Sequence, residues 1–219
     1  MIGIVNAMKS EADILLEQMD IERSLNVSGK DIFVGKAFQK DIVLVICGVG
    51  KVNAALGAAL AVHKFGADKI LNFGVAGGLN KKTELCKVYS IGKAVQFDFD
   101  LTQLNHTKIG TLDEREENYF PLSDLGLETY PMRNLGTSDR FNDSPQDFLL
   151  LTNELKADIR DMEGCAIVQA ATQMELPVYS FKAISDVAGS GSTTDQYLKN
   201  RSAALENLKA ALPEIFERL

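Results

Sequence analysis

The sequence predicts an α/β fold in which a parallel or mixed sheet is covered by helices. Short apolar runs rich in Val and Ile alternate along the chain with segments of helical periodicity. These runs are apolar at consecutive positions, as in strands that are buried on both faces. No repeat, low-complexity tract or linker divides the chain, so we expect one domain over residues 1–219.

The first half of the chain begins this alternation. The opening run is apolar and β-branched, and the turn Gln39-Lys40-Asp41 separates two further runs that are typical of paired strands. Apolar residues after the first run recur at helical spacing, and a later segment is rich in alanine. We therefore expect strands at 2–7, 32–38, 42–47 and 69–73, helices at 9–19 and 51–65, and a glycine-rich turn at 74–80.

The second half continues the pattern, with strands expected at 88–95 and 177–185. Residues 107–131 are polar and contain the acidic sequence DEREE, which favours a loop. Asp161 is placed to cap a helix at 162–174. Residues 195–212 are amphipathic and predict a last helix, which Pro213 should interrupt.

Composition excludes several classes of protein. The formal net charge is −7 and no basic run occurs, so nucleic acid and anionic membranes are not expected partners. Three cysteines and two histidines are too few for a disulfide framework or a zinc cluster, and we expect neither a metal nor a cofactor. The N-terminus lacks the features of a signal peptide, and no apolar run is long enough to span a membrane. These features favour a cytoplasmic protein.

Two glycine-rich segments follow predicted strands. CGVGKVNAALG (47–57) is not a Walker A loop, because Val52 stands where Ser or Thr is required, and Asn53 replaces the third glycine of a dinucleotide fingerprint. A tight strand-to-helix turn is the favoured interpretation. For GVAGG (74–78), two interpretations stay open: a turn that needs a positive φ angle, or a close approach of the backbone to a flat ligand.

Three carboxylates lie at the ends of predicted strands or helices. Glu11 follows the first strand, Glu163 begins an apolar helix, and Asp186 ends an apolar strand. Each one alone is typical of a helix end or a turn. Ligands of open α/β sheets bind beyond the carboxyl ends of the strands, so we expect 7–11, 74–79 and 185–188 to share one rim. A pocket with several carboxylates suits cleavage of a glycosidic bond, which needs an acid, a base and a grip on the sugar diol.

The ordered motifs GVGKVNAALGA, FGVAGGL, DFDLT, SDRF, DMEGCA and AISDVA, after the opening IGIVNAM, resemble the nucleoside phosphorylase superfamily over nearly the whole chain. Within it, the chain is most similar to 5′-methylthioadenosine/S-adenosylhomocysteine nucleosidases. The resemblance implies a three-layer α/β/α fold with a mixed central sheet, a homodimer, and a nucleoside as the small-molecule partner. It implies hydrolysis of the N-glycosidic bond, with release of adenine and a 5-thio-substituted ribose.

The resemblance also assigns roles to residues. Glu11 matches the glutamate that activates water, Glu163 the glutamate that binds the ribose hydroxyls, and Asp186 the aspartate that protonates the purine at N7. Phe141 matches the aromatic residue that stacks on the base, and the backbone of Asn142 matches the group that contacts the purine edge. The remaining substrate-binding positions are Met8, Val75, Ala76, Gly77, Met162 and Ser185.

Some positions depart from the family pattern. Lys182 stands where an arginine commonly precedes AISD, and Leu104 replaces an aromatic residue that lines the 5′ pocket. These departures leave a futalosine-type nucleosidase open as an alternative. A phosphate-dependent phosphorylase is a second alternative, although no arginine occurs between Arg23 and Arg115 to bind phosphate. A nucleoside-binding protein without activity is disfavoured, because binding alone needs no acid–base pair.

Overall fold

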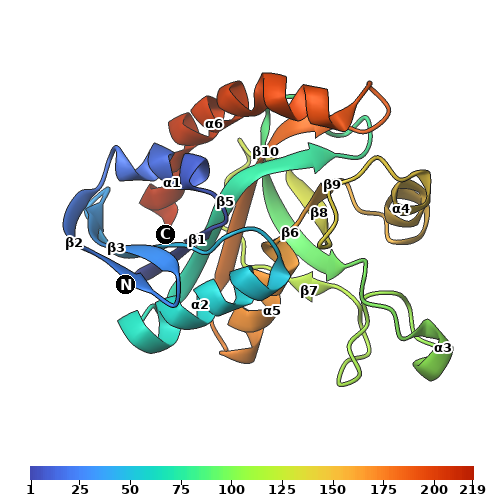
Figure 1. The fold of residues 1–219 in the computed structure, drawn as a ribbon, viewed down its shortest axis with the longest axis horizontal. Helices are drawn as coiled ribbons and strands as arrows, with labels where there is room; N and C mark the ends of the chain where they lie inside the picture. Colours follow the sequence, from blue (N-terminus) through green and yellow to red (C-terminus); the bar gives the residue numbers. More distant parts are fainter.

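The computed structural model describes residues 1–219 and contains one large mixed sheet between helices (Figure 1). The strands follow the order β10-β6-β8-β9-β5-β1-β4-β3-β2, and β7 pairs with β6. The strands are β1 Ile2–Asn6, β2 Asp20–Val27, β3 Lys30–Ala37, β4 Lys40–Ile46, β5 Lys69–Gly78, β6 Val88–Gln96, β7 Phe120–Pro121, β8 Met132–Thr137, β9 Ile159–Asp161 and β10 Val178–Val187.

The sheet is mixed, as predicted. Its centre is parallel, because β1 pairs in parallel with both β4 and β5, and β5 pairs in parallel with β10. The β2–β3–β4 meander and the β6–β10 pair are antiparallel. Because β10 also pairs with β5, the strands β5, β10, β6, β8 and β9 form a closed ring of pairings. This ring has no free edge, whereas β2 ends the other side of the sheet.

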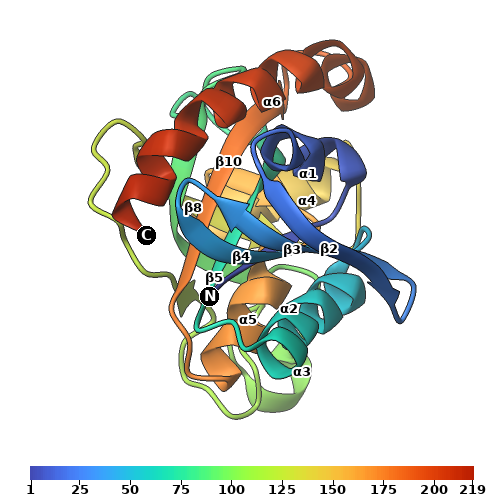
Figure 2. The same ribbon diagram turned by 90° about the vertical axis from the view of Figure 1, so that its left-hand side faces the viewer.

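Helices cover both faces, which gives three layers (Figures 1 and 2). The helices α2 (Lys51–Phe65) and α5 (Gly164–Gln173) pack on one face, where their alanines join the larger apolar cluster. The helices α1 (Lys9–Leu16) and α6 (Thr193–Arg218) pack on the other face, in a second cluster. Short helices occur at Thr102–Asn105 (α3), Pro145–Leu149 (α4) and Leu150–Glu154, the last of the π type.

Three local predictions were wrong. The segment 74–78 is not a turn: β5 continues to Gly78, and none of its glycines has a positive φ angle. Helix α6 continues through Pro213, because Leu212, Ile215 and Phe216 are all fully buried and hold both sides of the proline against the sheet. The polar segment 107–131 contains β7, although most of it is irregular as expected.

The pairing of β5 with β10 places the strand ends that matter for function. A bulge in β10 falls between Ile184 and Asp186, and Asp186 is in register with Gly77 of β5. A bulge re-aims the side chains that follow it. The carboxylate of Asp186 is thereby held over the end of β5 instead of following the regular alternation of the strand.

Leu208 tests the packing of α6. Its side chain is fully buried in the cluster shared by α1, α6 and the sheet. Leu208→Ala should lower the free energy of unfolding by about 2–5 kcal/mol, because it removes buried methyl groups and leaves a cavity. Urea denaturation measures this, with Leu104→Ala as the control because Leu104 is 75% exposed. Equal effects of the two substitutions would contradict the packing described for α6.

Candidate active site

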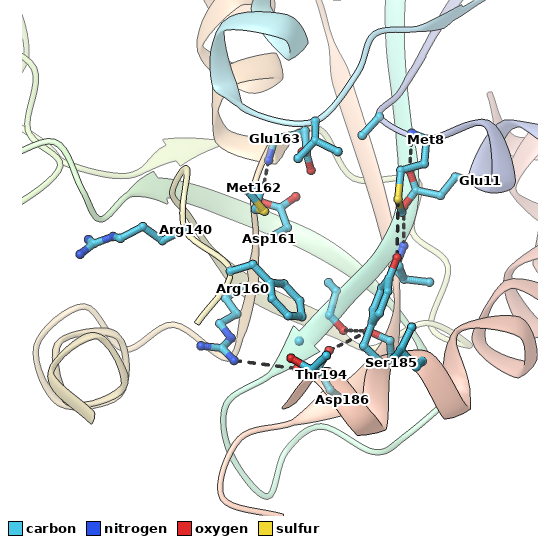
Figure 3. A pocket seen from close by; sticks show the side chains of 18 residues that line it. Met8, Glu11, Arg140, Arg160, Asp161, Met162, Glu163, Ser185, Asp186 and Thr194 are labelled. Atoms are coloured by element: carbon cyan, nitrogen blue, oxygen red, sulfur yellow. Dashed lines mark hydrogen bonds and ion pairs between the residues drawn. The ribbon is translucent and has the colours of Figure 1, made fainter. Parts of the chain in front are cut away.

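A cavity of about 350 Å³ opens at the carboxyl ends of β1, β5 and β10 (Figure 3). The rim predicted from the sequence is therefore present. All the predicted site residues except Asn142 line the cavity: Met8, Glu11, Val75, Ala76, Gly77, Phe141, Met162, Glu163, Ser185 and Asp186. Residues that the sequence interpretation missed also line it, namely Ala7, Val49, Arg140, Arg160, Asp161, Thr194, Tyr197 and Leu198.

Glu11 lies in the first turn of α1 and is 5% exposed. Its Oε1 accepts a hydrogen bond from the Val75 N–H at 3.0 Å, and its Oε2 accepts one from the Met8 N–H at 3.2 Å. A Cβ atom at Gly74 would lie 2.3 Å from Oε1, so this glycine is needed for the approach of strand and carboxylate. Burial raises the pKa of Glu11, and the positive charge of Lys182 acts against that rise.

Glu163 lies at the N-terminus of α5, facing the turn before α2. Its Oε1 accepts a hydrogen bond from the Gly50 N–H at 2.8 Å. Gly50 has a φ angle of 98°, which glycine adopts without strain. The segment 47–57 is thus the tight strand-to-helix turn predicted above, and its free N–H group binds a carboxylate of the protein itself. Burial raises the pKa of Glu163 to about 7, and the negative charge of Asp161 adds to the rise.

A buried ion pair lies beneath these two glutamates. Lys182 Nζ is 2.9 Å from Asp161 Oδ2, and the two side chains are 3% and 2% exposed. Asp161 also accepts hydrogen bonds from the Thr137 hydroxyl at 2.6 Å and from the Gly164 N–H at 2.9 Å. The predicted N-cap was wrong, because α5 begins at Gly164 and its N-cap is Glu163, although the Asp161 side chain does bind the first N–H of the helix. Burial acts to lower the pKa of Lys182, but the charges of Asp161, Glu11 and Glu163 outweigh burial and raise it. Lys182 therefore stays charged.

Asp186 lies at the opposite end of the cavity and is 2% exposed. Its Oδ1 accepts a hydrogen bond from the Ser185 hydroxyl at 2.8 Å, whereas its buried Oδ2 has no hydrogen-bond partner. Arg160 Nη2 is 3.9 Å from that oxygen. Burial raises the pKa of Asp186, and the Ser185 hydrogen bond and the charge of Arg160 only partly oppose the rise. The position of this carboxylate at the end of an apolar strand therefore has a physical consequence, since burial favours its protonated form.

Aromatic and thioether groups close the cavity between these ends. Phe141 is 52% exposed, and its ring meets the edge of Tyr197 at 5.8 Å between centroids. The Tyr197 hydroxyl is 3.6 Å from Met8 Sδ. Tyr197 was missed because an aromatic residue on an amphipathic helix is more often part of the core. Arg160 was missed because the short strand β9 was not recognised in the sequence.

Asn142 lies just outside the cavity. Its carbonyl oxygen accepts a hydrogen bond from Arg160 Nη1 at 2.7 Å, and its side-chain amide donates to Asp147 at 3.0 Å. No group of three or more His, Cys, Asp or Glu side chains is arranged to hold a metal ion. None of the helices combines the length and apolarity needed to cross a membrane.

Comparison with known proteins places the chain in a family. The profile of the Phosphorylase superfamily matches residues 1–217, and the chain belongs to that superfamily. Its relatives include nucleosidases of two kinds. It is 29% identical to a 5′-methylthioadenosine/S-adenosylhomocysteine nucleosidase from Colwellia psychrerythraea, over 90% of this chain and 88% of the relative. It is 28% identical to an aminodeoxyfutalosine nucleosidase from Campylobacter jejuni, over 89% of each chain.

Solved structures agree with the fold. A 5′-methylthioadenosine/S-adenosylhomocysteine nucleosidase from Helicobacter pylori superposes with a TM-score of 0.92 at 23% identity, covering 100% of this chain and 98% of that one. The Colwellia psychrerythraea nucleosidase, solved in complex with adenine, gives a TM-score of 0.91 at 27% identity and covers 100% and 95% of the two chains. The predicted three-layer fold with a mixed central sheet is confirmed.

The raised pKa of Glu163 predicts how the stability of the protein depends on pH. Because the folded-state pKa of Glu163 is raised from 4.5 to about 7, its contribution to stability is full below pH 4.5 and is lost as the pH rises through 7. Glu163→Gln keeps an acceptor for the Gly50 N–H and cannot ionise. Its free energy of unfolding should exceed that of the unmodified protein by on the order of 3 kcal/mol at pH 8.

Urea denaturation at pH 5 and pH 8 measures this difference. The gain should be smaller at pH 5, where Glu163 is protonated in the folded protein. If the gain in the free energy of unfolding were the same at both pH values, ionisation of Glu163 would not destabilise the folded protein. Glu154→Gln serves as the control, because Glu154 is exposed and should show no such dependence.

Proposed function

We propose that the chain hydrolyses the N-glycosidic bond of purine nucleosides that carry an enlarged 5′ substituent. The observation that carries the proposal is the arrangement of three carboxylates around the cavity, with buried Glu11 and half-buried Glu163 at one end and buried Asp186 at the other (Figure 3). Cleavage of the bond needs a proton for the departing base, a base for water and a contact to the sugar hydroxyls. The three carboxylates can divide these tasks.

Asp186 is the proposed acid. The raised pKa keeps its carboxyl protonated at a higher pH than an exposed aspartate, and its Oδ2 has no partner within the protein. The departing purine gains negative charge as the bond breaks, and a proton delivered to N7 neutralises that charge. Proton transfer of this kind typically contributes about 10²–10⁴-fold to the rate.

Glu11 is the proposed base and Glu163 the proposed ligand of the ribose diol. Two backbone N–H groups fix both oxygens of Glu11, and a raised pKa brings it closer to the pH at which a general base works best. Glu163 stands across the cavity from Met8 (Figure 3). As the sugar gains oxocarbenium character, both carboxylates stabilise the positive charge.

The cavity favours water over phosphate as the nucleophile. Its two arginines, Arg140 and Arg160, lie away from Glu11 (Figure 3), and Arg160 Nη2 is 3.9 Å from Asp186 Oδ2. The cation near Glu11 is Lys182, which is buried and paired with Asp161. A phosphate ion prefers arginine as a bidentate partner and would also be repelled by the buried glutamates. Phosphorolysis is therefore the second candidate.

The substrates proposed first are 5′-methylthioadenosine and S-adenosylhomocysteine, and futalosine-type nucleosides follow as the alternative. Both kinds are named among the relatives. A single domain, a homodimer and a cytoplasmic location remain predictions. Exposed apolar residues near the cavity mouth, at the start of α2, support the dimer: Val49 is 48% exposed, Val52 80% and Leu56 42%.

Product analysis tests the reaction. The protein is incubated with 5′-methylthioadenosine, S-adenosylhomocysteine, futalosine, aminodeoxyfutalosine and inosine, with and without phosphate. We expect release of free base and free sugar whose rate does not depend on phosphate. A sugar 1-phosphate formed only with phosphate would identify a phosphorylase instead, and binding without release would leave a nucleoside-binding protein.

Two substitutions separate the proposed acid from the proposed base. Asp186→Asn should lower kcat by about 10²-fold or more while the fold survives, because the amide cannot deliver the proton. Glu11→Gln should bind the nucleoside and fail to hydrolyse it. Steady-state kinetics and equilibrium binding check both, with Asp20→Asn as a control, because Asp20 is exposed on β2 and outside the cavity lining. Near-normal turnover by either variant would remove that residue from the mechanism.

A further inference from the structure

Arg160 occupies an unusual position at the Asp186 end of the cavity. On strand β9 it pairs directly with Gly77 of β5, and Gly77 is in register with Asp186 of β10. The three residues thus form one row across three strands. A Cβ atom at Gly77 would lie 2.7 Å from Asp186 Oδ2 and 3.1 Å from Arg160 Nε, so the missing side chain lets the two approach each other.

The guanidinium of Arg160 is held in place and largely buried. Its side chain is 13% exposed, Nη1 donates to the Asn142 carbonyl at 2.7 Å, and Nη2 donates to the Thr193 hydroxyl at 3.3 Å. Asp143 Oδ1 and Asp186 Oδ2 are 3.8 Å and 3.9 Å from Nη2. Arg160 therefore lines the cavity as a largely buried side chain, next to Asp186 Oδ2, which has no hydrogen-bond partner. Both groups are available to contact a ligand in the cavity.

These groups differ in which purine they can bind. A 6-oxopurine presents two neighbouring acceptors, N7 and O6, whereas adenine presents the acceptor N7 beside the donor 6-amino group. Arginine has donors only. The Asn142 backbone, which the family resemblance puts at the purine edge, offers one carbonyl as an acceptor, and that carbonyl already accepts from Arg160 Nη1. A second donor at that oxygen would also face the positive charge of the guanidinium.

We infer that Arg160, with protonated Asp186, selects nucleosides of 6-oxopurines over those of 6-aminopurines. Asp186 donates to N7 and the guanidinium donates to O6. The inference rests on the proposed nucleosidase function, and it changes the preferred base: a 6-oxopurine takes the place of adenine, the base of the two substrates proposed first above. The 5′ substituent is left as proposed above.

A purely structural role for Arg160 makes a different prediction. The guanidinium joins the Asn142 segment to the start of α6 through Thr193, so its loss could loosen both. In that case removal of Arg160 would lower activity toward every nucleoside by the same factor. Base selection instead requires that the ratio between two bases changes.

The first test uses the unmodified protein and two nucleosides that differ only at C6, 5′-methylthioinosine and 5′-methylthioadenosine. We expect kcat/KM for release of hypoxanthine to exceed that for release of adenine by about 10-fold to 100-fold, the range of one good pair of base contacts. Equal values, or a preference for the adenosine compound, overturn the inference and leave the nucleosidase function standing.

The second test uses Arg160→Met, which keeps much of the side-chain volume and removes every donor. The preference for 5′-methylthioinosine should fall by about 10-fold or more, and the adenosine compound should gain because the Asn142 carbonyl becomes free. Arg133→Met is the matched control, because its guanidinium also donates to a backbone carbonyl, that of Lys82, far from the cavity. An unchanged ratio in Arg160→Met contradicts the inference.

Binding of the free bases separates this inference from the function on which it rests. Titration calorimetry with hypoxanthine and adenine needs no turnover. Tighter binding of hypoxanthine supports the inference even if the protein releases no base from either nucleoside, a result that would overturn the nucleosidase function alone. Tighter binding of adenine overturns the inference. If Arg160→Met does not fold, Arg160→Lys replaces it. The inference is then also tested by the two comparisons made with the unmodified protein, that of the two nucleosides and that of the two free bases.

Discussion

The Lys182–Asp161 ion pair is the interaction on which the candidate site depends. Glu11, Glu163 and Asp186 line one cavity, Glu11 and Asp186 are buried, and burying unpaired negative charge is costly. Lys182 supplies positive charge to the two glutamates, and Asp161 pairs with it while accepting the first N–H of α5. A buried pair of this kind contributes little stability by itself, because both charges lose their hydration. Its contribution is to oppose the rise in pKa that burial causes in the two glutamates.

The main elements of the fold could be predicted because their signals are local. Continuous apolar runs identified β1, β3, β4, β6 and β10, and helical periodicity identified α1, α2, α5 and α6. The exposed strand β2 and the short strand β9 carry no such pattern, since their pairing is set by neighbours distant in sequence. The glycines at 74–78 misled the prediction for the same reason. They are needed for close contact with Glu11 and Asp186, which no local signal reveals.

The candidate site could be predicted to a similar extent. Glu11, Glu163 and Asp186 were found because polar residues that interrupt apolar segments stand out, and because the ordered motifs resemble a family. Arg160 and Tyr197 were not found, because each belongs to a segment in which such a residue is ordinary. The row formed by Arg160, Gly77 and Asp186 exists only once three strands are paired.

The closed ring of β5, β10, β6, β8 and β9 has a consequence for motion. A strand at a free edge can fray, but a strand with partners on both sides exchanges its amide hydrogens only when a larger unit opens. Both β5 and β10 are of this second kind, and together they carry Gly77, Ser185 and Asp186. The floor of the cavity should therefore be among the last regions to exchange with solvent. Any opening that admits a ligand must come from the segments above it, around Phe141 and the start of α6.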